Sequence, residues 1–339
     1  MQQLRSINHA RKKAVFFGEP EPTEQVFAQG RYEKIAALTD LYPHIVDLSN
    51  FNEHADRLRE VEVGFSTWGM PILTAAHLDK FPSLRAVFFA AGSVKFFAHP
   101  LLERGITVVS AWQANAIPVA EFTLSQILLS TKGYFRNTHA YHSQRNGRRA
   151  FRGHGNLGET VAILGTGAIG KKLIEFLRPF HLHVIVFDPF LSETSAAKLG
   201  VEKVSLEEAF QRGYVVSNHI ANLPETEGML HGELFALMRE NATFINTGRG
   251  ITVKEEGMIK VLQARPDITA LLDVTWPESP AEDSPLFSLP NVQLTTHIAG
   301  SLNDETVRMA DFCIEEFKAW ECGQPLRYAV SMQMLEMMA

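Results

Sequence analysis

A glycine pattern, Gly165-Thr-Gly167-Ala-Ile-Gly170, constrains the fold of this chain more than any other feature. It follows the apolar run TVAIL (160–164), which has the β-branched character of a buried strand, and it opens the helical pattern IGKKLIEFL (169–177). A second apolar run, HVIVF (183–187), comes next and ends at Asp188. The order strand, tight turn, helix, strand predicts a parallel βαβ unit of a doubly wound sheet.

The same spacing predicts a dinucleotide site. Gly165 would allow the tight turn, Gly167 would let a pyrophosphate approach the amides of the helix N-terminus, and Gly170 would let the helix pack closely on the strand. Asp188, 23 residues past Gly165, is placed to accept hydrogen bonds from ribose hydroxyls. It would repel a 2′-phosphate, and no Lys or Arg follows it in DPFLSE, which favours NAD over NADP. The alternative is that Asp188 is only a turn residue before Pro189.

Strand-like and helical patterns alternate along most of the chain, and 339 residues are enough for two domains. In the first third, the predicted strands are 14–17, 61–65, 84–90 and 106–111, with helices at 23–38 and 73–80. In the second series, the predicted strands are 160–165, 183–189, 214–220, 242–248, 268–274 and 292–297. The helices predicted between them are 169–179, 206–212, 232–239 and 254–264. Such alternation is typical of parallel sheets covered by helices.

Two longer helices are predicted at the junctions between these series. One is the apolar run 118–135, with Pro118 at its first position, and the other is the amphipathic run 305–321. The prediction is an α/β protein with two Rossmann/flavodoxin-like, doubly wound parallel-sheet domains and a cleft between them. Residues 1–117 plus 305–339 would form the substrate-binding domain, and residues 118–304 the NAD-binding domain.

Composition and charge argue against several classes of function. A net charge of −6 offers no basic surface for nucleic acid or an anionic membrane. No apolar run has the length of a membrane span, and MQQLRSINHARKK lacks the apolar stretch of a signal peptide. Cys313, Cys322 and the thirteen histidines show no metal-ligand spacing, so we expect no metal and a reducing cytoplasm. The most basic segment, RNGRRAFRGHG (145–155), is interpreted as a solvated or subunit-contacting loop, with phosphate binding as the alternative.

Three polar residues follow strand-like runs of the second series: Arg249 after ATFINTG, Glu278 after LLDVTWP, and His297 at the end of VQLTTH. Ligands of parallel sheets bind beyond the carboxyl ends of the strands. A nicotinamide coenzyme acting on a 2-hydroxy or 2-keto acid needs a cation for the carboxylate, a proton carrier and a group that tunes the carrier. Each residue alone also fits a structural role, as a solvated arginine, a surface glutamate or a histidine at a strand end.

These motifs resemble those of the D-isomer-specific 2-hydroxyacid dehydrogenases. The resemblance runs from LRAVFFAAGSV to TTHIAG and includes LGTGAIGKKL, SNHIANLPETEGML, FINTGRGITVKEE and LLDVTWPESP. It implies that Arg249 binds the substrate carboxylate and carbonyl, that His297 is the acid/base, and that Glu278, five residues after Asp273, is its partner. A carboxylate beside the imidazole would favour the protonated form that reduction of a keto group requires.

The resemblance also implies which residues contact the two ligands. Asp273 would contact the nicotinamide amide, and the backbone of Ala91, Gly92 and Ser93 would hold the substrate carboxylate. The predicted coenzyme-binding residues are Gly165, Gly167, Ala168, Ile169, Gly170, Asp188, His219, Ile220, Thr247, Gly248 and Asp273. A homodimer is expected, with 133–155 and the helix before it as candidate contacts.

The substrate-facing loop is predicted at FSTWGMP (65–71), which offers Thr67, Trp68 and Met70 but no basic side chain. A phosphorylated substrate is therefore less favoured than a small unphosphorylated 2-hydroxy or 2-keto acid. Trp68, Trp112 and Trp276 would either line an apolar pocket or pack in the core.

Rival functions remain open from the sequence. Glu278 argues against the formate dehydrogenase branch, where the resemblance would put Gln. An amino-acid dehydrogenase or ketoreductase would need a Lys or Tyr acid/base. An NAD(H)-responsive binding scaffold of the corepressor type, on the same fold, is the main alternative to an enzyme.

Overall fold

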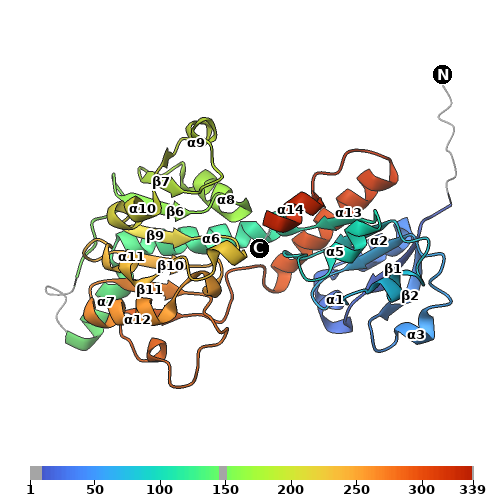
Figure 1. Cartoon of the computed structure of the whole chain (residues 1–339), viewed down its shortest axis with the longest axis horizontal. Coiled ribbons are helices and arrows are strands. Elements are labelled where there is room, and N and C mark those ends of the chain that lie inside the picture. Colours follow the sequence, from blue (N-terminus) through green and yellow to red (C-terminus); the bar gives the residue numbers. More distant parts are fainter. Residues whose placement is uncertain (1–9, 145–150, 338–339) are drawn as a thin grey trace. The chain divides into compact units, whose positions relative to one another are not determined.

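The computed structural model describes residues 10–144 and 151–337. Contacts within the chain divide it into two compact units (Figure 1). Unit 1 comprises Met1–Asn115 and Leu302–Met338, and unit 2 comprises Ala116–Ser301. Within the described ranges, no helix combines the length and the apolar character needed to cross a membrane.

Unit 1 is built on a six-stranded sheet with the order β13-β5-β4-β3-β1-β2, in which only β13 runs antiparallel. Its central strands are buried on both faces, because helices cover both sides and alternate side chains of β1 enter two different cores. The strands are β1 (Lys13–Phe17), β2 (Asp40–Val46), β3 (Val63–Ser66), β4 (Ala86–Phe89), β5 (Thr107–Ser110) and β13 (Ala329–Val330). The helices are α1 (Pro20–Val26), α2 (Arg31–Leu38), α3 (Phe51–His54), α4 (Ala75–Leu78), α5 (Ala98–Glu103), η4 (Asn303–Thr306), α13 (Val307–Glu321) and α14 (Met332–Met337).

Unit 2 is built on a seven-stranded, entirely parallel sheet with the order β12-β11-β10-β9-β6-β7-β8. The strands are β6 (Thr160–Leu164), β7 (His183–Phe187), β8 (Glu202–Lys203), β9 (Val215–Asn218), β10 (Thr243–Asn246), β11 (Thr269–Leu272) and β12 (Val292–Leu294). The chain progresses in opposite directions from the neighbouring strands β6 and β9, which makes this junction the switch point where ligands of such sheets bind. Two parallel-sheet α/β units confirm the predicted fold class.

Except for the first two, the helices of unit 2 connect consecutive strands of its sheet, and they appear in Figure 1 in the green-to-orange part of the chain. Helix α6 (Trp112–Thr131) begins in unit 1 and ends in unit 2. The others are α7 (Tyr134–Gln144), α8 (Ala168–Leu177), α9 (Glu193–Leu199), α10 (Leu206–Arg212), η1 (Pro224–Thr226), α11 (Gly232–Ala236), η2 (Gly250–Thr252), α12 (Glu255–Ala264) and η3 (Pro285–Phe287).

Two predicted helices were wrong in extent. The segment 23–38 forms two helices, because Gln29 and Gly30 adopt φ values of 54° and 84°, which no α-helix accommodates. The helix predicted at 118–135 begins at Trp112 and contains Pro118 in its interior rather than at its first position. It ends at Thr131, and α7 follows where a loop was expected.

Several short elements were not predicted, among them β2, β8, β13 and α9. Strand β2 lies at the edge of its sheet, contains Pro43 and leaves most side chains partly or fully exposed, so it lacks the apolar signature of the central strands. Strands β8 and β13 have two residues each, which is too short for any periodicity to appear.

The basic segment 145–155 is described only from Phe151 onward, so the arginines at 145, 148 and 149 lie outside the described residues. The part that follows packs back on the end of α6, with Gly153 N donating to Lys132 O (3.0 Å) and Gly155 N to Thr131 O (2.8 Å). The guanidinium of Arg136 lies 4.4 Å from the centre of the Phe151 ring.

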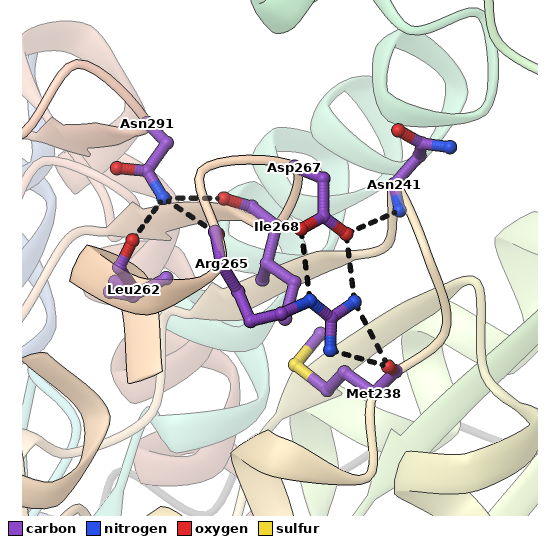
Figure 2. Close-up of polar contacts among 7 residues, drawn as sticks. All are labelled: Met238, Asn241, Leu262, Arg265, Asp267, Ile268 and Asn291. Carbon is purple, nitrogen blue, oxygen red and sulfur yellow. Dashed lines mark hydrogen bonds and ion pairs between the residues drawn. The ribbon is translucent and has the colours of Figure 1, made fainter. Parts of the chain in front are cut away.

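A polar cluster fixes the turn between α12 and β11 (Figure 2). Arg265 donates through Nε and Nη2 to the Asp267 carboxylate (2.9 and 2.7 Å), which also accepts from Asn241 N (3.1 Å). Asn291 Nδ2 donates to three backbone carbonyls, of which Ile268 O is the nearest at 2.8 Å. The Arg265 guanidinium holds the pKa of Asp267 below its ordinary value. The cluster anchors the start of β11, the strand whose other end leads to Asp273.

Candidate functional site

The glycine-rich turn after β6 contains glycines of two kinds. Gly165 has φ of 93°, and a Cβ there would lie 2.8 Å from His219 O; a Cβ at Gly170 would lie 2.1 Å from Gly165 O. Packing within the unit therefore requires both. A Cβ at Gly167 would meet no atom within 4 Å, although Gly167 is the N-cap of α8. This leaves open space beside the first amides of the helix, where an anion is stabilised by unpaired N–H groups and the helix dipole.

Asp188 connects the end of β7 to the glycine-rich turn. Its Oδ2 accepts from Thr166 N (2.7 Å) and Thr166 Oγ1 (2.5 Å), and its Oδ1 accepts from Phe190 N (2.8 Å). The residue is partly exposed, so each carboxylate oxygen keeps acceptor capacity toward a ligand. Asp188 thus caps its own turn, as one reading of the sequence suggested, and in addition holds the loop that faces α8.

His219, directly after β9, lies beside the same turn. Its backbone N donates to Leu164 O (2.8 Å), and its Nε2 is 2.9 Å from Ser217 Oγ. Burial lowers the pKa of His219 to about 3, so the imidazole is neutral at physiological pH. Its Nδ1 is buried and has no hydrogen-bond partner in the part of the chain that the structure describes.

Close backbone packing explains the sequence Gly248-Arg249-Gly250 after β10. A Cβ at Gly248 would lie 3.0 Å from Asn218 O, and a Cβ at Gly250 would lie 2.0 Å from Thr275 O. The turn is therefore held between the segments that follow β9 and β11, with Arg249 in extended conformation between them. Neither glycine tolerates a side chain unless this packing changes.

The positive charge of Arg249 is only weakly balanced by neighbouring groups of unit 2. Its side chain is mostly buried, and its Nη1 donates to Gly248 O (2.8 Å). Burial lowers the pKa of Arg249, and the negative charge of Glu278 opposes this shift. No carboxylate of the described residues lies within the 4 Å of an ion pair with it. A partly desolvated guanidinium of this kind is suited to binding an anionic ligand.

His297 and Glu278 are brought into direct contact. His297 Nδ1 lies 2.5 Å from Glu278 Oε1, and about half of each side chain is exposed. His297 has φ of 58°, an uncommon conformation for a residue with a side chain. Its backbone N donates to Asp273 O (3.0 Å). The pair leaves the other ring nitrogen, Nε2, available to a ligand.

Asp273, predicted to contact the nicotinamide amide, also makes hydrogen bonds within the unit. It is buried, and its carboxylate accepts from Thr295 Oγ1 (2.6 Å), Ile298 N (2.8 Å) and Ala299 N (3.0 Å). These partners all belong to the segment that carries His297. The carboxylate therefore anchors the histidine loop to the end of β11, a role that sequence reasoning missed.

Glu255, at the start of α12, was also missed. Its Oε1 accepts from Trp276 N at 2.6 Å, and burial raises the pKa of this carboxyl group. Thr275 Oγ1 donates to Pro277 O (2.9 Å). These contacts fix the segment between β11 and Glu278. The sequence signal was weak, because Glu255 and Glu256 look alike as first-turn acids of a helix.

In unit 1, the segment after β4 was predicted to hold a substrate carboxylate. Ser110 Oγ donates to Ala91 O (3.1 Å) and Gly92 O (2.5 Å). Among the described residues, no acceptor is bonded to the amide N–H groups of Gly92 and Ser93. The loop is thus fixed through its carbonyls while its amides remain available.

The interpretation of loop 65–71 was partly wrong. Thr67 is fully buried and donates to Ala90 O (2.9 Å), and Met70 belongs to the core, so neither can face a substrate. Trp68 is 40% exposed and remains a candidate for contact with a ligand. Of the other two tryptophans, Trp112 packs against Tyr328 in unit 1, whereas Trp276 is 56% exposed.

The chain is similar to known proteins of one family. Residues 124–299, slightly more than half of the chain, match the family model of the D-isomer specific 2-hydroxyacid dehydrogenase, NAD binding domain. A D-3-phosphoglycerate dehydrogenase of Archaeoglobus fulgidus is 28% identical over 234 residues, which cover 69% of this chain but only 44% of that relative. The chain therefore spans less than half of the length of such relatives.

Solved structures establish the same fold over nearly the whole chain. A phosphoglycerate oxidoreductase from Rhizobium etli superposes with a TM-score of 0.81 at 24% identity, covering 96% of this chain and 100% of that one. The apo D-mandelate dehydrogenase of Rhodotorula graminis gives a TM-score of 0.79 at 19% identity, covering 95% and 98%. The predicted family and the predicted NAD cofactor are both confirmed. This chain belongs to the D-isomer specific 2-hydroxyacid dehydrogenases, and residues 124–299 are its NAD binding domain.

Proposed function

We propose that this chain interconverts a small D-2-hydroxy acid and its 2-keto acid with NAD as coenzyme. The observation that carries the proposal is the contact between His297 and Glu278 at the same sheet edge as the Arg249 guanidinium. A proton carrier, a carboxylate partner and a partly buried cation are the groups that this reaction requires of a protein.

The residues around the switch point fit the coenzyme. The open backbone beside Gly167 suits the pyrophosphate, and Asp188 has acceptor capacity left for ribose hydroxyls. We assign the wall of the coenzyme site to four residues after β9 and β10: His219, Ile220, Thr247 and Gly248. In this proposal unit 2 binds NAD, and unit 1 binds the substrate carboxylate through the free amides of Gly92 and Ser93. The bound nicotinamide supplies or accepts the hydride.

His297 transfers the proton in this proposal. Because Glu278 engages Nδ1, the proton is exchanged with the substrate oxygen at Nε2. In reduction, the imidazolium donates to the keto oxygen; in oxidation, the neutral ring removes the hydroxyl proton. Glu278 stabilises the imidazolium and fixes the ring, and Asp273 holds the loop that positions it.

Arg249 binds the substrate carboxylate and polarises its carbonyl. Its donors form charge-assisted bonds, and the partial burial of the guanidinium strengthens them by keeping water away.

Trp68 and Trp276 expose large rings, and loop 65–71 has no basic side chain, so we propose an unphosphorylated substrate with an apolar side chain. The relatives named for phosphoglycerate make 3-phosphohydroxypyruvate the necessary comparison.

The test is NADH oxidation with glyoxylate, hydroxypyruvate, pyruvate, phenylpyruvate, branched-chain 2-keto acids and 3-phosphohydroxypyruvate. We expect turnover with an unphosphorylated acid and its loss in Arg249→Ala and His297→Ala, with NADH binding retained in both. Unchanged reduction in either variant would remove that residue from the mechanism. Tight NADH binding without turnover of any acid would instead favour the NAD(H)-responsive scaffold.

We also propose that the chain forms a homodimer through the end of α6 and the segment 133–155. Leu129, Tyr134, Tyr141 and Leu157 expose apolar surface in this region. Light scattering of the purified protein tests the proposal, and a monomeric mass at micromolar concentration would contradict it.

A further inference from the structure

The segments after β9 and β10 are joined by a buried polar network. Asn218, Asn246 and Thr252 are each no more than 1% exposed. Asn218 Nδ2 donates to Asn246 Oδ1 (3.0 Å) and to Thr252 Oγ1 (2.9 Å). Asn218 Oδ1 accepts from Ile220 N (3.1 Å). Both donor hydrogens and the acceptor of this carboxamide are therefore used, which fixes its orientation uniquely.

The network ends on the backbone of Arg249. Thr252 Oγ1 donates to Arg249 O at 2.7 Å, so its hydroxyl both accepts from Asn218 and donates to the arginine. Asn246 Oδ1 accepts from Gly248 N (3.1 Å), and Asn246 Nδ2 lies 3.4 Å from Arg249 O. The peptide unit before Gly248 and the peptide unit after Arg249 are thus tied to strands β9 and β10.

We infer that Asn218 and Thr252 are positioning residues that set the direction of the Arg249 side chain. The inference rests on the proposed function, in which Arg249 binds the substrate carboxylate. The side chain leaves its backbone in an extended conformation between two glycines, and glycine alone does not hold a turn in one conformation. The buried network supplies this restraint, because a buried donor or acceptor left without a partner would cost free energy.

The informative variant is Thr252→Val, which keeps the shape of the side chain and removes the hydroxyl. We expect the KM for the 2-keto acid to rise about tenfold, because both buried hydrogen bonds of this hydroxyl are lost, with the Kd of NADH changed less than about twofold. Thr252→Ser keeps the hydroxyl and should retain a KM close to that of the unmodified chain.

A matched control separates positioning from general stability. Thr39 is also buried and donates through Oγ1 to a backbone carbonyl, Ile35 O, at 2.8 Å, but it lies in unit 1 at the end of α2. Thr39→Val should lower the melting temperature as Thr252→Val does and leave the KM unchanged. An equal rise in KM in both variants, or no rise in Thr252→Val, overturns the inference.

Arg249→Ala distinguishes a failure of the proposed function from a failure of this inference. If Arg249→Ala reduces keto acids normally, the proposed role of Arg249 fails. If Arg249→Ala loses activity but Thr252→Val leaves the KM unchanged, only the inference about the network fails. Hydrogen exchange of the peptide 246–253 decides the inference without any turnover. Faster exchange in Thr252→Val than in Thr252→Ser supports it, and equal exchange refutes it.

Discussion

His297 Nδ1 lies 2.5 Å from Glu278 Oε1, although β12 and the preceding turn separate the two residues along the chain. For each partner, a residue outside the pair anchors the neighbouring chain segment by hydrogen bonds. Asp273 anchors the histidine segment through three hydrogen bonds, and Glu255 anchors the segment before Glu278 through Trp276 N. The contact therefore depends on two further acids, the buried Asp273 after β11 and the partly exposed Glu255 at the start of α12.

Glu278→Gln should lower kcat/KM for keto-acid reduction about 100-fold, because the amide keeps the size of the side chain but loses the charge that stabilises the imidazolium. The Kd of NADH and the melting temperature should stay close to their original values. Steady-state kinetics measures the first and fluorescence titration the second. Glu282→Gln, an exposed glutamate four residues later, serves as the control and should be silent. Normal kinetics in Glu278→Gln would exclude a role for the carboxylate.

Alanine at two glycines of unit 2 should give opposite phenotypes. Gly167→Ala meets no atom within 4 Å, so we expect normal stability together with a Kd for NADH raised about tenfold or more, because the added methyl group occupies the path of the pyrophosphate.

Gly250→Ala would place its Cβ 2.0 Å from Thr275 O, so we expect a loss of about 2–3 kcal/mol in stability and of substrate reduction. Thermal unfolding and NADH titration of both variants check the pair. A stable Gly250→Ala would show that the packing of this turn is not as close as described.

Asp273→Asn separates two roles for the same residue. If its main task is to hold the loop 295–299, kcat should fall and stability should drop by about 1–3 kcal/mol, while NADH binding changes little. Thr295→Val removes one of the three donors and should give a smaller effect of the same kind. A weaker Kd for NADH with an unchanged kcat at saturation would instead support the coenzyme contact suggested by the family resemblance.

Asp267→Asn should destabilise the protein in a pH-dependent way. The pKa of Asp267 is lowered in the folded state by Arg265, so its contribution is complete above the unfolded value near 3.8 and disappears as the pH falls through the folded value. We expect the variant to be less stable by about 1–2 kcal/mol at pH 7. The difference should shrink below about pH 4. Chemical denaturation at several pH values measures it, and a difference independent of pH would contradict the assignment.

The sequence by itself determined those features that are encoded within a short window of the chain. Apolar runs and the glycine spacing at 165–170 were sufficient to predict a parallel α/β fold and the NAD cofactor, both of which are confirmed. The polar residues after successive strands gave Arg249, Glu278 and His297 as candidates, and their roles stay predictions. Parallel strands have their carboxyl ends along one edge of the sheet, so the residues that follow these strands lie at the same edge. Correct prediction of the strands therefore also predicts which residues gather there. The break in the helix at Gln29 and Gly30 was missed, because it results from positive φ values at these two residues. The residue types alone do not specify such backbone conformations.

Only the tertiary structure decided how the candidate residues are held. The bond from Asn218 to Thr252 joins residues 34 positions apart, and that from Ile298 to Asp273 joins residues 25 positions apart. Burial of Thr67 and Met70 likewise depends on the packing of β3 and its loop against the core of unit 1. Hydrogen-bond partners and burial are set by neighbours in space, and no local period in the chain specifies which polar side chain will meet which backbone group.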